Sequence, residues 1–228
     1  IAVNSFGVSD EVWKNAVIDQ LNKIQHTSNL YYNEPCAKLA EMLCEKTGMK
    51  KVFFSNSGAE ANECAIKAAR RYAYNKYGDG HSTIITLKNS FHGRTITTLS
   101  ATGQEHYHKE FTPFTEGFVY AEPNNFDDIK KLSKENKCIA VMIEIVQGEG
   151  GVCPLDKEYV QQIREFTEKN DMLMIVDEVQ TGNGRSGLLY AYMNCDVVPD
   201  IVTTAKGLAG GLPLGAVLFG EKVKDIYT

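Results

Sequence analysis

The chain has 228 residues, of which 43% are hydrophobic, so it can bury a large core. Its formal net charge of −5 at pH 7 argues against a nucleic-acid-binding protein, which usually carries a basic stripe. No apolar run is long enough to cross a bilayer, and the first residues lack the basic region of a signal peptide. The six cysteines form no C-x-x-C pair and several lie in apolar segments, which predicts reduced, mostly buried thiols in a cytoplasmic protein.

Apolar residues along the chain alternate between helical and strand spacing. Ser9 is a candidate cap for a helix that begins at Asp10, and a second helix is expected between Pro35 and Gly48. The segment KVFFS (51–55) predicts a strand. The elements expected after it are a long helix at 59–78, strands at 83–87 and 118–121, a helix at 125–136, a strand at 138–146, a helix at 155–170, and strands at 172–178, 200–205 and 215–220.

This order of elements predicts an α/β fold. Near-continuous apolar strands are buried on both faces, and helices between them imply right-handed crossovers. We therefore expect a mostly parallel sheet sandwiched by helices. In such sheets ligands bind at the carboxyl ends of the strands, so functional residues should follow strands directly.

The segment SNSGAE (55–60) follows the first predicted strand and opens the long helix. Free N–H groups at a helix N-terminus bind anions, and Gly58 with Ala59 lets a phosphate approach the backbone closely. An ordinary capping box formed by Ser57 and Glu60 explains the same residues equally well. No G-x-x-x-x-G-K-[ST] pattern is present, which excludes a P-loop.

The loop NSFHGRT (89–95) follows the strand at 83–87 and combines an aromatic residue, a histidine and an arginine. Phe91 can stack on a planar ligand, and Arg94 can hold a carboxylate through two N–H groups. Taken alone, such a loop is more often a surface turn with an exposed arginine.

Asp177 and Lys206 each lie at the end of a predicted strand. A carboxylate at the end of a buried strand needs a partner, which is either a protonated ring nitrogen or an internal salt bridge. A partly buried lysine with a lowered pKa can attack a carbonyl to form a Schiff base; the alternative is a lysine that extends to solvent. The glycines at 207, 210 and 211 favour the first interpretation because they clear space around Lys206.

The segment GNGRSG (182–187) fits the dinucleotide pattern G-x-G-x-x-G, but it neither follows a strand directly nor opens a helix, so we reject an NAD site. The other four segments together describe one ligand with a phosphate, a flat ring with a basic nitrogen, and an aldehyde. That ligand is pyridoxal 5'-phosphate, to which a protein supplies a lysine and an aspartate.

Five segments in particular carry a family resemblance. SNSGAEANECAIKAAR, FHGRT, EIVQGEGG, DEVQTGNGRSG and TTAKGLAGGLPLGA lie in order along nearly the whole chain. As a set they resemble the signature segments of class III (ornithine-type) pyridoxal-phosphate aminotransferases of fold type I. HTSNLYYNEP and FHGRT are most similar to the acetylornithine branch of that family. The resemblance implies transamination of N-acetylornithine with 2-oxoglutarate, giving N-acetylglutamate semialdehyde and glutamate in arginine biosynthesis.

The resemblance also implies roles for the residues around the ring. Lys206 would form the Schiff base and shuttle the proton, and Asp177 would keep the pyridine nitrogen protonated. Val179 and Phe91 would pack on the two ring faces. Gln180 would approach the ring hydroxyl.

Further roles concern the phosphate and the substrate. Arg94 would hold a substrate carboxylate, and Glu149 would be a switch residue that masks a second arginine in one half-reaction. Glu144 would be a supporting carboxylate near Gln180. The phosphate would be bound by the residues that open the long helix: Ser57, Gly58 and Ala59.

The same resemblance implies a domain organisation and a homodimer. Residues 1–30 would form an N-terminal segment and linking helix, and residues 31–228 the large cofactor-binding domain, without the family's C-terminal small domain. The family's active site is shared across the dimer, and HTSNLYYNEP is expected near its interface. Two alternatives stay open. One is another class III aminotransferase, acting on ornithine, succinylornithine or 4-aminobutyrate, and the other is a truncated chain without catalysis.

Overall fold

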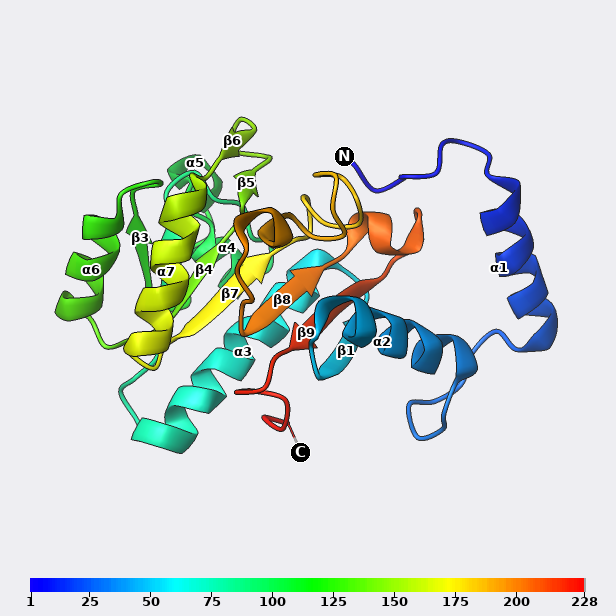
Figure 1. Ribbon diagram of the computed structural model, residues 1–228, viewed down its shortest axis with the longest axis horizontal. Coiled ribbons are helices and arrows are strands. Elements are labelled where there is room, and N and C mark those ends of the chain that lie inside the picture. Colours follow the sequence, from blue (N-terminus) through cyan, green and yellow to red (C-terminus); the bar gives the residue numbers. More distant parts are fainter. Residues whose placement is uncertain (228) are drawn as a thin grey trace.

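The computed structural model describes residues 1–227, which form a seven-stranded sheet of order β1-β9-β8-β7-β4-β2-β3 (Figure 1). Its strands are β1 (Lys51–Ser55), β2 (Thr83–Leu87), β3 (Phe118–Ala121), β4 (Cys138–Ile143), β7 (Leu173–Asp177), β8 (Ile201–Thr204) and β9 (Gly215–Phe219). The short strands β5 (Val146–Gln147) and β6 (Cys153–Pro154) pair separately. The helices are α1 (Glu11–Lys23), α2 (Glu34–Thr47), α3 (Gly58–Tyr77), α4 (Ile96–Ala101), α5 (Glu105–His108), α6 (Phe126–Glu135) and α7 (Lys157–Lys169), with 3₁₀ helices at Ala191–Cys195 and Lys206–Ala209.

Five neighbouring strands of this sheet run parallel to one another, as their apolar sequences predicted: β3, β2, β4, β7 and β8. In this sheet β9 alone runs opposite to the other six strands, because it pairs antiparallel with both β8 and β1. The sheet is therefore mostly parallel, which confirms the predicted α/β class.

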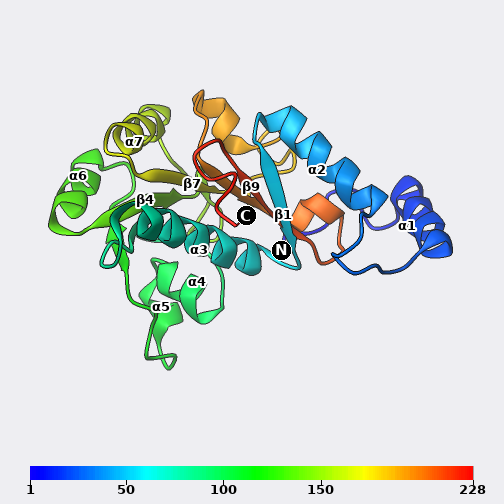
Figure 2. The ribbon, with the colours of Figure 1, turned by 90° about the horizontal axis from the view of Figure 1, so that it is seen from below.

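Helices cover both faces of the sheet, α3 on one face and α2, α6 and α7 on the other (Figure 2). Side chains of each strand alternate between the two cores. In β7, Leu173 and Ile175 pack into the core beneath α3, whereas Met174 and Val176 pack into the opposite core. This double burial explains why the strands are apolar at nearly every residue.

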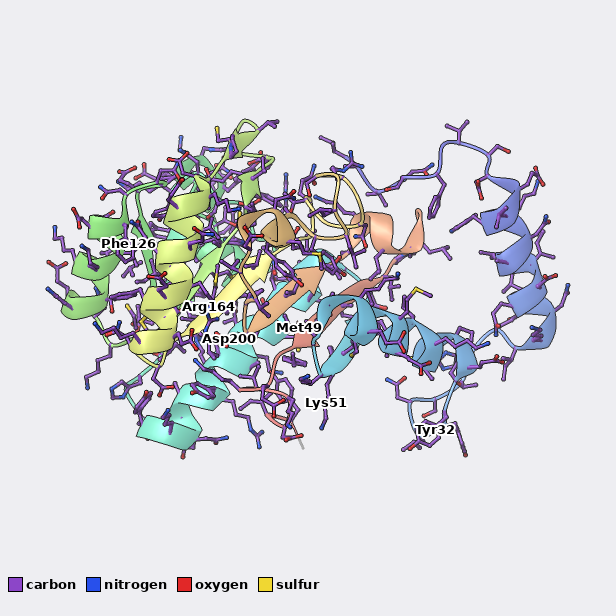
Figure 3. The ribbon with its side chains drawn as sticks, in the orientation of Figure 1. Tyr32, Met49, Lys51, Phe126, Arg164 and Asp200 are labelled. Atoms are coloured by element: carbon purple, nitrogen blue, oxygen red, sulfur yellow. The ribbon has the colours of Figure 1, made fainter. Side chains whose placement is uncertain are left out.

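A buried ion pair fixes α7 against the amino end of β8. Arg164 of α7 donates to Asp200 at 2.8 Å, and Asp200 also accepts the N–H of Met174 (Figure 3). A buried carboxylate with several donors keeps its charge stabilised. This contact lies at the end of the strands opposite to the residues predicted for the site.

Most helix and strand bounds agree with the sequence prediction to within two residues, but two details were wrong. Asp10 rather than Ser9 caps α1, because the Asp10 carboxylate accepts a hydrogen bond from the first turn. The strand predicted at 138–146 ends at Ile143, because Glu144 leaves the strand ladder and its side chain turns toward another loop.

The N-terminal helix α1 stands away from the sheet and buries none of its own residues (Figure 1). The predicted boundary between residues 1–30 and 31–228 stays a prediction. No helix within residues 1–227 is long and apolar enough to span a membrane. Two cysteines, Cys36 and Cys153, are exposed, although the sequence predicted mostly buried thiols.

Candidate active site

The carboxyl ends of β1, β2, β4, β7 and β8 meet at one cavity of about 500 Å³. This is the edge of the sheet at which parallel α/β folds bind ligands. Every residue predicted for the site lines this cavity: Ser57, Gly58, Ala59, Phe91, Arg94, Glu144, Glu149, Asp177, Val179, Gln180 and Lys206. The fold thus brings together residues that lie up to about two thirds of the chain apart.

The start of α3 forms one wall of the cavity and is capped by Ser57. Ser57 Oγ accepts the N–H of Glu60 at 3.2 Å, but Glu60 Oε2 accepts the N–H of Asn56 at 2.6 Å rather than that of Ser57, so the full capping box is not formed. The cap leaves the N–H groups of Gly58 and Ala59 without an acceptor inside the helix. Capping and anion binding are therefore compatible at this terminus.

Gly58 is required by close packing against Val179. A Cβ atom added at Gly58 would lie 2.6 Å from Val179 Cγ1 and 2.8 Å from Val179 Cγ2. Both residues line the cavity, so the glycine lets the valine side chain approach the helix N-terminus.

Asp177 is buried and holds three hydrogen bonds. Its Oδ2 accepts from Asn62 Nδ2 at 2.7 Å and from His92 Nδ1 at 2.8 Å, and its Oδ1 accepts from the N–H of Val179 at 3.0 Å. An ionised carboxylate only accepts hydrogen bonds, so His92 carries a proton on Nδ1. Among the described residues, no lysine or arginine forms an ion pair with this carboxylate, which is held instead by Asn62, His92 and the backbone.

Glu144 follows β4 and is almost completely buried. Its Oε2 accepts the N–H of Phe91 at 3.0 Å. Burial, reinforced by the nearby charge of Asp177, raises the pKa of Glu144 well above its ordinary value. The carboxyl group thus fixes the backbone of the loop that carries Phe91.

Lys206 has a strained backbone and a perturbed amine. Its φ of +50° lies in the left-handed region that residues other than glycine rarely adopt. Burial lowers the pKa of Lys206, while the charges of Asp177 and Glu144 oppose that shift. Its Nζ donates to Gln180 Oε1. A lowered pKa increases the fraction of neutral amine, which is the nucleophilic form.

The sequence predicted that the three glycines after Lys206 clear space around that lysine, but two of them pack against other residues. A Cβ atom at Gly207 would lie 2.7 Å from Ser5 Oγ, and one at Gly210 would lie 2.5 Å from the Phe6 ring. These two glycines therefore admit the N-terminal segment of the chain itself. Only Gly211 of the three lines the cavity.

Phe91, Arg94 and Glu149 form the outer wall of the cavity. The Arg94 guanidinium lies 6.0 Å from the Phe91 ring centroid and 5.1 Å from that of Tyr107. Glu149 accepts hydrogen bonds from Tyr107 and Gln104 rather than from an arginine. The prediction that Glu149 masks a second arginine stays a prediction.

Four residues that hold the predicted ones in place were not predicted from the sequence. Their signals were weak but present, since Asn62 is a polar residue within a run of small apolar ones and His92 stands between Phe91 and a glycine. The missed residues are Asn62, His92, Gln104 and Tyr107.

Comparison with known proteins identifies the family. Residues 1–228 match the family described as "Aminotransferase class-III". The chain belongs to the class III aminotransferases. Residues 182–190 form turns and bends, so no helix opens directly after GNGRSG, in agreement with the rejection of a dinucleotide site there.

Several aminotransferases are similar in sequence to this class III aminotransferase chain. It is 55% identical over 225 residues to an acetylornithine aminotransferase from Haemophilus ducreyi, covering 99% of the chain and 57% of that protein. It is 46% identical over 228 residues to a succinylornithine transaminase from Citrobacter koseri, covering 100% of the chain and 56% of that protein. The chain thus spans little more than half the length of these relatives.

Solved structures agree on the fold. The N-acetylornithine aminotransferase from Stenotrophomonas maltophilia superposes with a TM-score of 0.86 at 38% identity, over 99% of this chain and 57% of that one. The ornithine aminotransferase from Toxoplasma gondii superposes with a TM-score of 0.94 at 31% identity, over 100% of this chain and 55% of that one.

Proposed function

We propose that this class III aminotransferase chain binds pyridoxal 5'-phosphate in the cavity at the strand ends. The uncommitted N–H groups of Gly58 and Ala59 suit a phosphate. Asp177 uses three of its roughly four acceptor positions, which leaves one for the N–H of a ring nitrogen. The Lys206 amine lines the same cavity and suits an aldehyde.

When bound, pyridoxal phosphate supplies an aldehyde for a lysine amine and a ring that withdraws electrons from the substrate carbon. The Nζ atom of Lys206 would then accept a proton from the substrate carbon and later donate it back. Asp177 would hold the proton on the ring nitrogen through its remaining acceptor position. Phe91 and Val179 would orient the ring from two sides, and Arg94 would bind a substrate carboxylate.

We propose that the reaction is the transfer of the terminal amine of N-acetylornithine to 2-oxoglutarate, giving N-acetylglutamate semialdehyde and glutamate. This proposal is supported by identities of 50–55% to proteins named acetylornithine aminotransferase. It implies a place in arginine biosynthesis and a cytoplasmic location.

The observation that carries the proposal is Lys206, with its left-handed backbone and its burial-lowered pKa, in one cavity with Asp177. The test is the visible absorption spectrum of the protein with pyridoxal phosphate, before and after N-acetylornithine is added. We expect a visible band that the amino donor abolishes, and no turnover by Lys206→Ala. Lys222→Ala is the matched control, because Lys222 is a partly buried lysine outside the cavity. Full turnover by Lys206→Ala would refute the proposal.

A second candidate donor is N-succinylornithine, which is favoured by the 46% identity to succinylornithine transaminases. A panel of N-acetylornithine, N-succinylornithine, ornithine and 4-aminobutyrate separates the donors by kcat/KM. A visible absorption band that none of the four donors changes would instead favour a chain that binds the cofactor without transamination.

We also propose that the chain forms a homodimer through the segment HTSNLYYNEP (26–35). The support is its exposed apolar side chains, since Leu30, Tyr31 and Tyr32 are 87%, 71% and 103% exposed. Monomeric proteins rarely leave such residues uncovered together.

A further inference from the structure

The outer wall of the cavity holds an arginine and a carboxylate that do not pair with each other. Arg94 and Glu149 both line the cavity. Among residues 1–227, no carboxylate lies within ion-pair distance of Arg94. The two groups are nevertheless within electrostatic reach, because the charge of Arg94 contributes to the lowered pKa of Glu149. Other contacts must therefore keep the Glu149 carboxylate away from Arg94.

Two residues outside the cavity hold it. Tyr107 Oη donates to Glu149 Oε1 at 2.6 Å, and Gln104 Nε2 donates to Glu149 Oε2. Each carboxylate oxygen thus has its own donor. Partial burial on its own raises the pKa of Glu149, but these two hydrogen bonds, together with the charges of His106 and Arg94, lower that pKa below its ordinary value. The lowered pKa keeps Glu149 charged, so it would be an effective competitor for Arg94 if it were released.

Both donors are themselves anchored. Gln104 Nε2 also donates to the carbonyl oxygen of Ser90 at 3.1 Å. The Tyr107 ring meets Phe91 edge-on, with centroids 5.6 Å apart. The Arg94 guanidinium lies 5.1 Å from the Tyr107 ring centroid, which is a cation–π contact. The two side chains come from α5 and the residue before it, beside α4 (Figure 2).

We infer that Gln104 and Tyr107 are positioning residues that keep Glu149 from neutralising Arg94. Arg94 thereby stays free to bind the carboxylate of an amino-acid substrate. The inference rests on the proposed function, since it takes Arg94 as the site of that carboxylate. Without the two donors, Glu149 pairs with Arg94 and competes with the substrate.

The test uses N-acetylnorvaline, which keeps the carboxylate of N-acetylornithine and lacks the reactive amine. Its dissociation constant is measured by calorimetry on the protein loaded with pyridoxal phosphate. We expect Tyr107→Phe, which keeps the ring, to weaken binding about tenfold, as loss of a hydrogen bond to a charged group does. The KM for N-acetylornithine should rise in parallel while kcat changes little. Gln104→Leu is a second variant with the same expected direction.

The decisive variant is the double substitution Tyr107→Phe with Glu149→Gln. A neutral glutamine cannot neutralise Arg94, so the double variant should bind N-acetylnorvaline as tightly as the unsubstituted protein. The control is Tyr120→Phe, which removes a hydroxyl that donates to Ser100 O away from the cavity. It should leave the dissociation constant unchanged.

The outcomes separate the inference from the proposed function. If the unsubstituted protein binds the probe and Tyr107→Phe binds it equally well, the inference is wrong and the function stands. Weak binding by Tyr107→Phe that Glu149→Gln does not restore also overturns it, because Tyr107 then acts only through packing. If the unsubstituted protein neither binds the probe nor turns over N-acetylornithine, the proposed function fails and the inference fails with it.

Discussion

At the residue scale, Asp177 is buried and accepts three hydrogen bonds, none of them from a lysine or an arginine. Asp177→Asn keeps the shape of the side chain and removes the charge that a carboxylate carries. We expect kcat to fall about a hundredfold, as for other groups that stabilise developing charge, while the affinity for pyridoxal phosphate falls far less. Single-turnover kinetics and a cofactor titration measure the two effects. An unchanged kcat would show that the charge of Asp177 plays no part in the reaction.

The neighbouring Glu178 predicts a pH dependence of stability. It is fully buried, accepts from Thr181 Oγ1 and the N–H of Tyr192, and burial raises its pKa to about 7. Between the ordinary value of 4.5 and about 7, the unfolded chain releases this proton and the folded chain keeps it. Its contribution to folding stability is therefore full below pH 4.5 and lost as pH rises through about 7, a change of about 3 kcal/mol.

Glu178→Gln should remove this dependence. The free energy of unfolding in urea, compared at pH 5 and pH 8, should fall more for the unsubstituted protein than for the variant. Glu165→Gln, at an exposed position on α7, is the control and should retain the full dependence. Equal slopes for the unsubstituted protein and Glu178→Gln would contradict the prediction.

At the element scale, the sequence predicted which segments form strands and helices but not all of their geometry. Apolar periodicity depends on burial, so it located the strands of the main sheet well. It favours a mostly parallel sheet but does not fix the direction of each strand, so the antiparallel pairing of β9 could not be predicted. The early end of β4 depends on the contact of Glu144 with Phe91, which lies 53 residues away in sequence. The helix α4 was missed because ITTLSA (96–101) is short and rich in β-branched residues.

The residues of the candidate site also divide into those that the sequence predicted and those that it did not. The residues at strand ends could be predicted because the fold class says where ligands bind. The residues that hold them could not, because their partners are set by tertiary contacts. Asn62 and His92 reach Asp177 from elements 115 and 85 residues away in sequence. A polar residue on the buried face of α3 was the available signal for Asn62.

The contact between α3 and the loop after β7 predicts the effect of a single methyl group. Gly58→Ala would place Cβ within 2.6 Å of Val179 Cγ1, so the helix N-terminus or the valine must shift. We expect the affinity for pyridoxal phosphate to fall about tenfold, in line with overpacking costs. An absorbance titration measures the affinity. Gly58→Ala combined with Val179→Ala should recover part of it, because the clashing methyl groups are gone, whereas unaltered binding by Gly58→Ala alone would disprove the contact's role.

At the scale of the whole molecule, the N-terminal part up to α2 buries far less apolar surface than the sheet and its covering helices. The sheet and its covering helices form two continuous cores. In contrast α1 buries no residue, and the loop before α2 exposes large apolar side chains, with Tyr32 extending away from the body of the molecule (Figure 3). The segment from α1 to α2 therefore lacks the covering that the rest of the chain has, and a second copy of the chain is the covering that we propose.

This proposal predicts the mass and its sensitivity to substitution. Light scattering after size exclusion should give twice the monomer mass. Leu30→Ser combined with Tyr32→Ser should shift the protein toward monomer, because it removes apolar area from the proposed interface. Val152→Ser is the control, since Val152 is 72% exposed but lies beside β6, away from that segment. A monomer at all concentrations would refute the homodimer, and a dimer that survives the double substitution would place its interface elsewhere on the chain.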